Sequence, residues 1–281
     1  MQIVHAHEAQ RQGASAHRPG GIGFVSLLRG TEDTAGNYQL ALVEAHGYSA
    51  PRHRHNFDQV RIVLEGAFGY DRGMTQPAGT LGYFPEGTYY TQSSEGRSLT
   101  LLLQAGGPTG HGYMSDRQLR AAVAELQAKG HFDAGVYTWH DAQGKKHNKD
   151  GYEAAWEHVR GRPIVYPKPC FEQPVLWQAD RFPFIKTDQT GVERRDFAQF
   201  TSGHLGISEI RLAPGAQWHT AADAQEILLC QFEGSSHAGK VELQRHDSLS
   251  LSPGEGVTLT AGDQGSRFYE FLLMRRAGAE G

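Results

Sequence analysis

Hydrophobic residues along this chain recur in short stretches that are separated by turns containing glycine and proline. Such stretches lie at residues 38–45 (YQLALVEA), 59–64, 99–104, 207–212 and 268–274. Runs of this length that are rich in valine, isoleucine and leucine, and that are bounded by turn signals, are typical of β-strands. The pattern therefore predicts an all-β protein over most of the chain.

One part of the chain departs from this pattern. Residues 115–130 (SDRQLRAAVAELQAKG) fit an amphipathic helix that Ser115 can cap. Its apolar residues fall on one helical face: Leu119, Ala122, Val123 and Leu126. A second helix is predicted at residues 151–160, and the polar segment 142–150 between the two is interpreted as a solvated loop. We expect residues 113–162 to form a helical connector between two β domains, residues 1–112 and 163–281.

An internal repeat supports two β domains of the same topology. Three landmarks recur at a constant separation of 168 residues: Gly47 with Gly215, Glu65-Gly66 with Glu233-Gly234, and Pro85 with Pro253. A single glycine match would carry little weight, because the chain contains 35 glycines. One register that holds several landmarks over roughly 40 residues is much harder to obtain by chance.

The landmarks resemble the two sequence motifs of the cupin superfamily. The first motif is matched in its spacing by Gly47, His53, His55, Gln59 and Gly66. The second is matched by Gly79, Pro85, Gly87, Tyr90 and Ser94, with Tyr90 where the motif has histidine and Ser94 where it has asparagine. The resemblance covers about 40 residues in each half and implies two jelly-roll barrels, which is a bicupin arrangement.

The resemblance implies that only the first barrel keeps a site. In the second barrel the four ligand positions hold Ala221, Asp223, Ile227 and Thr258, which is no metal-binding set. We therefore expect the C-terminal barrel to lack a metal site.

Strand alternation predicts which side chains share the interior of the first barrel. If His53 and His55 point inward, the period of two also directs Gln59 and Arg61 inward. Tyr90 and Gln92 share a phase on the opposing strand, so we expect them to face the same interior. A pocket of this polarity is costly to bury without a ligand or a water network.

The resemblance implies one divalent metal ion held by His53 and His55, with Fe(II) or Mn(II) before zinc or nickel. Gln59 would be a third ligand or would lie next to the ligands. Its amide oxygen is a weaker donor than a carboxylate, so a site without metal also stays open. Tyr90 would act with the histidines in catalysis.

Arg61 and Gln92 are predicted to bind the substrate. A guanidinium beside a pocket suits a carboxylate or an enolate oxygen. The other interpretation of Arg61 is an ion pair with Asp58 or Glu65.

Three functions remain open on these residues. The first is a metal-dependent dioxygenase-type oxidoreductase that acts on a small organic substrate, as the resemblance implies. The second is a metal-free isomerase or epimerase in which His53 or His55 is the base and Tyr90 is the acid. The third is a protein that binds a small molecule without chemistry.

Composition narrows the class of partner. A net charge of −4 gives no reason to expect nucleic acid or an anionic membrane as a partner. The chain has neither an apolar leader nor a stretch long enough to cross a bilayer, so we expect a cytoplasmic protein. A homodimer is expected from the exposed sheet faces of such barrels.

The second His-x-His pair, His5 and His7, is interpreted as an accident of a disordered N-terminus.

Overall fold

The computed structural model describes residues 1–281 apart from residues 19, 35, 110–112, 201–204, 221–224 and 274–281. The chain divides into two compact units. The site unit comprises Arg11–Val25 and Arg29–Trp177, and the C-terminal unit comprises Met1–Gln10, Ser26–Leu28 and Gln178–Gly281. These units differ from the boundaries expected from the sequence, because the first ten residues belong to the C-terminal unit.

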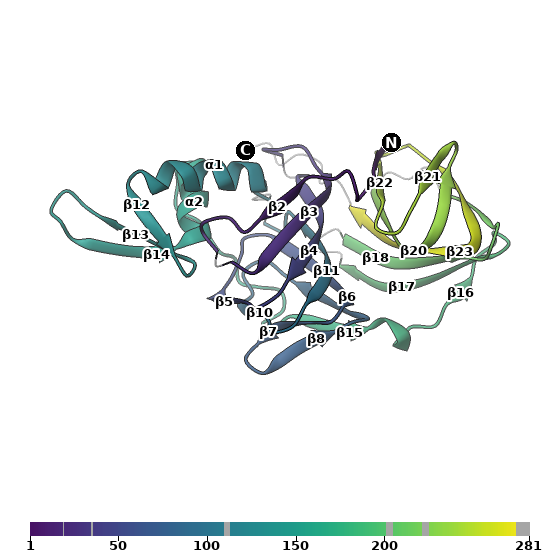
Figure 1. Cartoon of the computed structure of the whole chain (residues 1–281), viewed down its shortest axis with the longest axis horizontal. Helices are drawn as coiled ribbons and strands as arrows, with labels where there is room; N and C mark the ends of the chain where they lie inside the picture. Colours follow the sequence, from purple (N-terminus) through teal and green to yellow (C-terminus); the bar gives the residue numbers. More distant parts are fainter. Residues whose placement is uncertain (19, 35, 110–112, 201–204, 221–224, 274–281) are drawn as a thin grey trace. The chain divides into compact units, whose positions relative to one another are not determined.

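Two sheets form the barrel of the site unit (Figure 1). The larger sheet has the order β15-β9-β6-β11-β4-β3-β2. Its strands are β2 (Arg11–Gly13), β3 (Ile22–Arg29), β4 (Tyr38–Ala45), β6 (Asp58–Glu65), β9 (Thr80–Phe84), β11 (Ser98–Ala105) and β15 (Val175–Gln178). The smaller sheet has the order β5-β10-β7-β8, and its strands are β5 (Tyr48–His53), β7 (Ala67–Asp71), β8 (Met74–Pro77) and β10 (Tyr90–Ser94).

The all-β prediction is confirmed, and the predicted strands lie where the hydrophobic pattern places them. Strand β4 has the predicted bounds, while β6 and β11 each extend one residue beyond them at both ends. Strand β6 lies between β9 and β11, and all its residues from Asp58 to Val63 are buried. Both of its faces are therefore covered as far as Val63, which explains why apolar and polar side chains alternate there without an exposed position.

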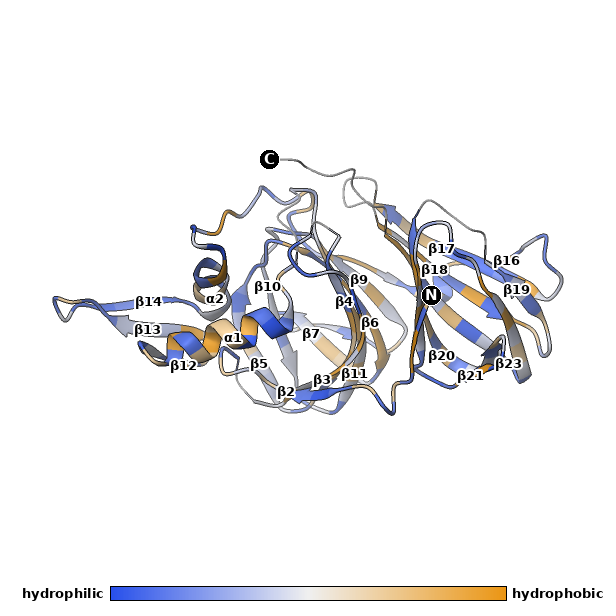
Figure 2. Ribbon diagram, turned by 90° about the horizontal axis from the view of Figure 1, so that it is seen from above, coloured by the Kyte–Doolittle hydropathy of each residue, from blue (hydrophilic) through white to orange (hydrophobic). Residues whose placement is uncertain are grey.

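Residues 113–162 belong to the site unit and contain the two predicted helices, α1 (Asp116–Gln127) and α2 (Gly151–Arg160). They also contain a three-stranded sheet, β12 (Gly130–Asp133), β13 (Val136–His140) and β14 (Lys146–Asp150). The prediction of a loop over 142–150 was wrong for its second half, which forms the hydrophilic strand β14 (Figure 2). Within this strand His147 stacks on Trp139 and bonds to Asp141 at 2.8 Å.

The C-terminal unit is built on a nine-stranded sheet with the order β1-β22-β20-β23-β18-β17-β16, on which β19 pairs with β23 and β21 with β20. Its strands are β1 (Gln2–Val4), β16 (Ile185–Lys186), β17 (Val192–Phe200), β18 (Leu205–Leu212), β19 (Gln217–His219), β20 (Glu226–Ala238), β21 (Val241–Leu243), β22 (Ser248–Leu251) and β23 (Thr258–Leu273). A short 3-10 helix, Ala179–Arg181, precedes β16.

The N-terminal residues are part of this sheet. Strand β1 pairs antiparallel with β22, and His5 Nδ1 lies 2.7 Å from a carboxylate oxygen of Asp247. The interpretation of His5 as part of a disordered terminus was therefore wrong. Short apolar strands of three residues carry too little alternation to be recognised from sequence.

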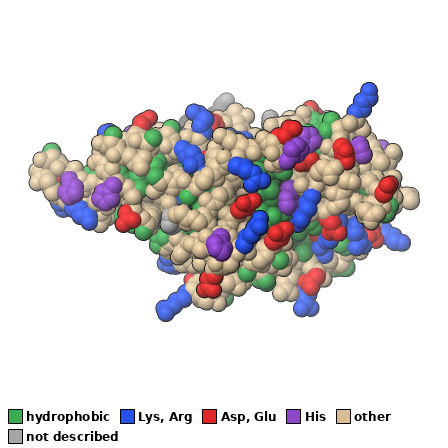
Figure 3. Space-filling view, in the orientation of Figure 1, with side chains coloured by type: hydrophobic (Ala, Val, Ile, Leu, Met, Phe, Trp, Pro, Cys, Tyr) green, Lys and Arg blue, Asp and Glu red, His purple; other side chains and the backbone are tan. Residues whose placement is uncertain are grey.

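Two further observations concern membrane-spanning helices and the charge of the surface. None of the helices in the described ranges is long and apolar enough to cross a membrane. On the face drawn in Figure 3, basic and acidic side chains are interspersed, so neither sign dominates that face.

Candidate functional site

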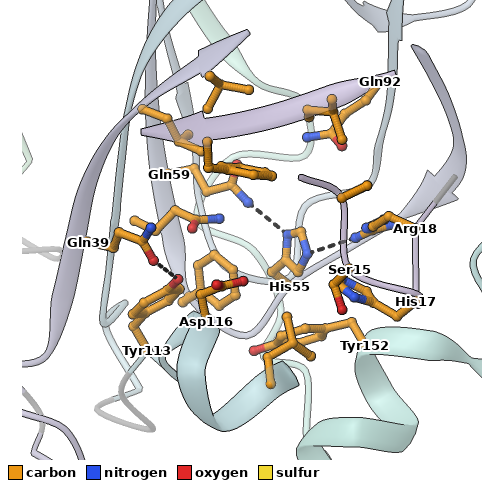
Figure 4. Close-up of a pocket in the computed structure, with 18 of the residues that line it drawn as sticks. Ser15, His17, Arg18, Gln39, His55, Gln59, Gln92, Tyr113, Asp116 and Tyr152 are labelled. Carbon is orange, nitrogen blue, oxygen red and sulfur yellow. Dashed lines mark hydrogen bonds between the residues drawn. The ribbon is translucent and has the colours of Figure 1, made fainter. Parts of the chain in front are cut away.

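A cavity of about 100 Å³ lies in the site unit. It is bordered by Gln59 and Arg61 of β6, Gln92 of β10, Tyr152 of α2 and Arg18 of the segment between β2 and β3 (Figure 4). A cavity of about 150 Å³ in another protein holds benzene. By that measure this one suits a ligand of roughly four to six non-hydrogen atoms.

Four of the six predicted site residues border the cavity: His55, Gln59, Arg61 and Gln92. The other two, His53 and Tyr90, adjoin it through the ring of His55. The ring centroid of His53 lies 5.0 Å from that of His55 and 4.7 Å from that of Tyr90. The structure thus brings all six residues into one cluster, as strand alternation predicts.

A hydrogen-bond chain joins this cluster at His55 (Figure 4). The Nδ1 atom of His55 lies 2.5 Å from the hydroxyl of Tyr90, and Arg18 Nη2 lies 3.3 Å from Nε2 on the other side of the ring. A guanidinium can only donate, so Nε2 must accept and the ring proton must sit on Nδ1. His55 therefore donates to the Tyr90 oxygen, which also accepts from Gln59 Nε2 at 2.7 Å.

Arg61 is a buried cation without a carboxylate partner. Its side chain is 2% exposed and lies over the rings of Phe84 and Tyr90 at 3.9 and 4.5 Å. Its Nη2 donates to Gln59 Oε1 at 3.1 Å, while Nη1 has no hydrogen-bond partner. Arg61 forms no ion pair within the described ranges of the chain, and the expected pair with Asp58 or Glu65 is not found.

Burial sets the protonation states in this cluster. It lowers the pKa of His53 and of His55 well below 6.5, with the charge of Arg18 adding to the effect in both cases. Burial also raises the pKa of Tyr90 to about 12 and lowers the pKa of Arg61. At neutral pH the imidazoles are therefore neutral and the phenol is protonated, while a guanidinium keeps its charge.

The cavity consequently has a positive electrostatic field. Two further charged residues border it, Asp116 and Arg120, and these pair with each other at 2.7 Å. The charges of Arg18 and Arg61 remain uncompensated within the described ranges. Burial of an unpaired charge is strongly unfavourable, so an anion in the cavity would offset a cost that the ligand-free protein carries.

Sequence analysis missed three residues of this site. Arg18 and the buried His17 come from the segment before β3, which carries no landmark of the repeat. Tyr152 of α2 places its ring edge-on to His55, at 4.9 Å between centroids, and its hydroxyl donates to Asn56. The pattern gave no signal for Arg18 or His17, whereas Tyr152 could have been suspected because it falls on the buried face of a predicted helix.

The predicted metal ligands do not present a donor set that fits a divalent ion. His53 has its Nδ1 bonded to the carbonyl of Pro51 and its Nε2 free to bind. Both ring nitrogens of His55 are engaged, and the side-chain oxygen of Gln59 accepts from Arg61. Over the described ranges no group of three or more His, Cys, Asp or Glu side chains is placed to hold a metal ion.

The corresponding positions of the C-terminal unit carry no such set where they are described. Ile227 is a buried core residue, and Thr258 bonds through its hydroxyl to His219 at 2.7 Å. Ala221 and Asp223 lie outside the described residues.

No family model matches the chain, and no curated protein matches it. Solved structures do match it over nearly its whole length. HEPD of Streptomyces albus, with 2-hydroxyethylphosphonate and Fe(II) bound, has a TM-score of 0.60 at 10% identity, covering 99% of this chain and 77% of that chain. Oxalate decarboxylase of Bacillus subtilis has a TM-score of 0.59 at 12% identity, covering 97% and 76%.

A third match extends over both chains. The bacterial pirin YhhW of Escherichia coli, in complex with nickel(II), has a TM-score of 0.53 at 12% identity and covers 97% of this chain and 98% of that chain. Matches at such identities show the fold. The chain has the bicupin fold, as the sequence motifs predict.

Proposed function

We propose that this bicupin chain catalyses metal-independent proton transfer on a small organic anion, in the manner of an isomerase. The cavity of the site unit would bind the anion, and His55 would be the base. The observation that carries the proposal is a neutral, oriented imidazole beside two guanidinium groups that lack carboxylate partners within the described part of the chain. Of the two reactions left open by the sequence, this one needs only groups that the chain supplies.

The expected reaction starts at a carbon next to a carboxylate or carbonyl group. The bound anion draws the guanidinium of Arg18 away from Nε2 of His55. The C–H bond then breaks, its proton moves to that Nε2, and the electron pair stays on the substrate as an enolate. The Tyr90 oxygen holds the imidazole from its Nδ1 side, so its Nε2 lone pair faces Arg18 and the cavity. The charges of Arg18 and Arg61 favour the enolate, because they act where negative charge develops.

A metal-dependent dioxygenase remains the other prediction from the sequence. Its support is the fold, which this chain shares with proteins that carry Fe(II) or nickel(II). Its weakness is the donor set, since only His53 of the three predicted ligands offers an unengaged atom. Fold alone does not fix chemistry, and the arrangement of this chain's own side chains supports proton transfer.

Deuterium exchange tests the proposal. The full chain is incubated in D₂O with small 2-oxo and 2-hydroxy acids and an excess of chelator, and loss of the C–H signal is followed by proton NMR. We expect exchange that survives the chelator and that falls by about 100-fold or more in His55→Gln. Tyr90→Phe is expected to lose less, because Tyr90 acts through His55.

The outcomes separate the three functions. Exchange or oxygen uptake that depends on added metal would contradict the proposal and favour the dioxygenase. Saturable binding of the acids without exchange would instead indicate a binding protein. Unchanged exchange in His55→Gln would remove His55 from the role of base.

A further inference from the structure

The guanidinium of Arg18 lies at the ring nitrogen of His55 that a metal ion would need. Nδ1 of His55 faces Tyr90 and Gln59, which leaves Nε2 as the atom for coordination, and Arg18 Nη2 is 3.3 Å from it. The Nε2 atom of His53 is buried and without a partner, and its ring lies 5.0 Å from that of His55 between centroids. Arg18 thus holds the coordinating atom of one histidine in this pair.

The segment that carries Arg18 is held by packing. Ser15 and His17 are 6% and 7% exposed, and the amide of Arg18 donates to the carbonyl of Ser15 at 2.9 Å. Gly151 allows a close approach to this turn, since a Cβ there would lie 3.2 Å from the Cβ of His17. The carbonyl of Gly13 also accepts from Arg120 at 2.7 Å. Arg18 is therefore placed beside the histidines by the fold of its own segment.

We propose that Arg18 takes the place of the metal ion in this barrel: its guanidinium blocks coordination by Nε2 of His55 and supplies a fixed positive charge in its stead. A guanidinium cannot be deprotonated in a protein at neutral pH, and it is never lost by dissociation. This inference does not depend on the proposed reaction, because it concerns which cation the two histidines face. Metal binding can therefore test it without any turnover.

The experiment titrates Mn(II) and Ni(II) into chelator-treated full-length protein by calorimetry. Arg18→Met removes the cation, and Arg18→Glu replaces it with a carboxylate, which completes the two-histidine, one-carboxylate set of many metal sites. If Arg18 occupies the site nearly all the time, its removal raises the apparent affinity by about 100-fold or more. We expect about one equivalent of metal in Arg18→Glu, weaker binding in Arg18→Met, and loss of the site when His53→Ala is added.

Arg54→Glu is the matched control. Arg54 stands between the two histidines in sequence, but its guanidinium lies over the rings of Tyr89 and Tyr166 at 4.7 and 4.0 Å. A carboxylate there is expected to leave the protein as poor a metal binder as the unmodified chain. Thermal unfolding verifies that each variant is folded.

Two results would overturn the inference. One is tight binding of about one equivalent of metal by the unmodified chain that is lost in His53→Ala, because Arg18 would then not block the site. The other is the absence of any gain in both Arg18 variants when they unfold at the temperature of the unmodified protein. This second result would show that something other than Arg18 keeps metal away.

Discussion

Arg61 combines complete burial with the lack of a carboxylate partner in the described ranges of the chain. A charge in that position lowers stability unless it serves a ligand, because desolvation is not repaid by any ion pair. Its contacts with Phe84 and Tyr90 recover part of that cost through cation–π attraction. Arg61 is thus a residue at which stability and ligand binding are expected to oppose each other.

Arg61→Met should therefore stabilise the ligand-free protein while it weakens binding of small organic anions. Met has a similar length and is apolar, so it removes the buried charge and leaves little empty space. We expect the free energy of unfolding to rise by about 1 kcal/mol or more. Urea unfolding of both proteins, with and without an added 2-oxo acid, measures this effect.

Arg72→Met at an exposed position is the control, and it should change neither stability nor binding. A loss of stability in Arg61→Met, together with unaltered anion binding, would mean that Arg61 is a structural residue. The charge of the cavity would then have to be assigned to Arg18 alone.

Strand alternation and motif spacing together were sufficient to predict the residues that β6 and β10 bring to the cavity. Gln59, Arg61 and Gln92 follow from a period of two once His53 and His55 point inward. Arg18 could not be found in this way, because it arrives from a segment outside the repeat. The chemistry of the site changes with this one residue, since it decides whether the histidines face a metal or a guanidinium.

The helices show what local sequence determines at the scale of the element. Ser115 and Gln118 form the predicted capping box of α1, and Asp150 caps α2, which ends at Gly161 in a left-handed conformation. These contacts involve neighbours in sequence, so they can be predicted from the chain alone. Strand β14 was missed because its stability comes from backbone pairing with β13. Its own polar side chains are typical of a loop.

Loss of the α2 cap should affect the site through Tyr152. Asp150 Oδ1 accepts from the amides of Tyr152 and Glu153 at 2.9 and 3.0 Å. Asp150→Ala is expected to lower the free energy of unfolding by about 1 kcal/mol. It should also increase amide hydrogen exchange in the first turn of α2, where Tyr152 contacts His55.

Amide hydrogen exchange of the α2 peptide, measured by mass spectrometry, tests this effect. Asp180→Ala, at an exposed position, serves as the control. A loss of stability spread evenly over the chain, without faster exchange in α2, would contradict a local capping role. Equal effects of the two substitutions would contradict it as well.

At the scale of the whole molecule, strand β1 at the start of the chain completes the sheet that β16 to β23 form near its end. Strand β1 pairs with β22 through three residues, and Ile3 packs against the core of the C-terminal unit. Sequence analysis predicted both barrels from the repeat, but it assigned this strand to the first barrel because chain order suggested so. Pairing between segments that are 240 or more residues apart cannot be predicted from local hydrophobic periodicity.

The contact of His5 with Asp247 makes this attachment sensitive to pH. The hydrogen bond to Asp247 is the main cause that raises the pKa of His5 above 6.5, and it outweighs burial, which lowers it. A group whose pKa is higher in the folded protein stabilises that state fully below its unfolded pKa, and the contribution disappears as pH rises through the folded pKa. We therefore expect the N-terminal strand to be held more firmly at about pH 5.5 than at about pH 8.5.

His5→Gln tests this coupling, since glutamine can still bond to Asp247 but carries no charge. The difference in unfolding free energy between the unmodified chain and His5→Gln should be largest near pH 5.5 and should shrink steadily toward pH 8.5. His7→Gln is the matched control, because His7 is exposed and makes only loose contacts in the described ranges, with Glu8 at 3.6 Å and with the His5 ring at 5.7 Å between centroids. A difference that stays constant over this range, or that grows with rising pH, would contradict an ionised His5 in the folded protein. The strand would then be held by its backbone pairing, by Ile3 and by the contacts of Met1 and Ala6 with Glu255 and Asp247.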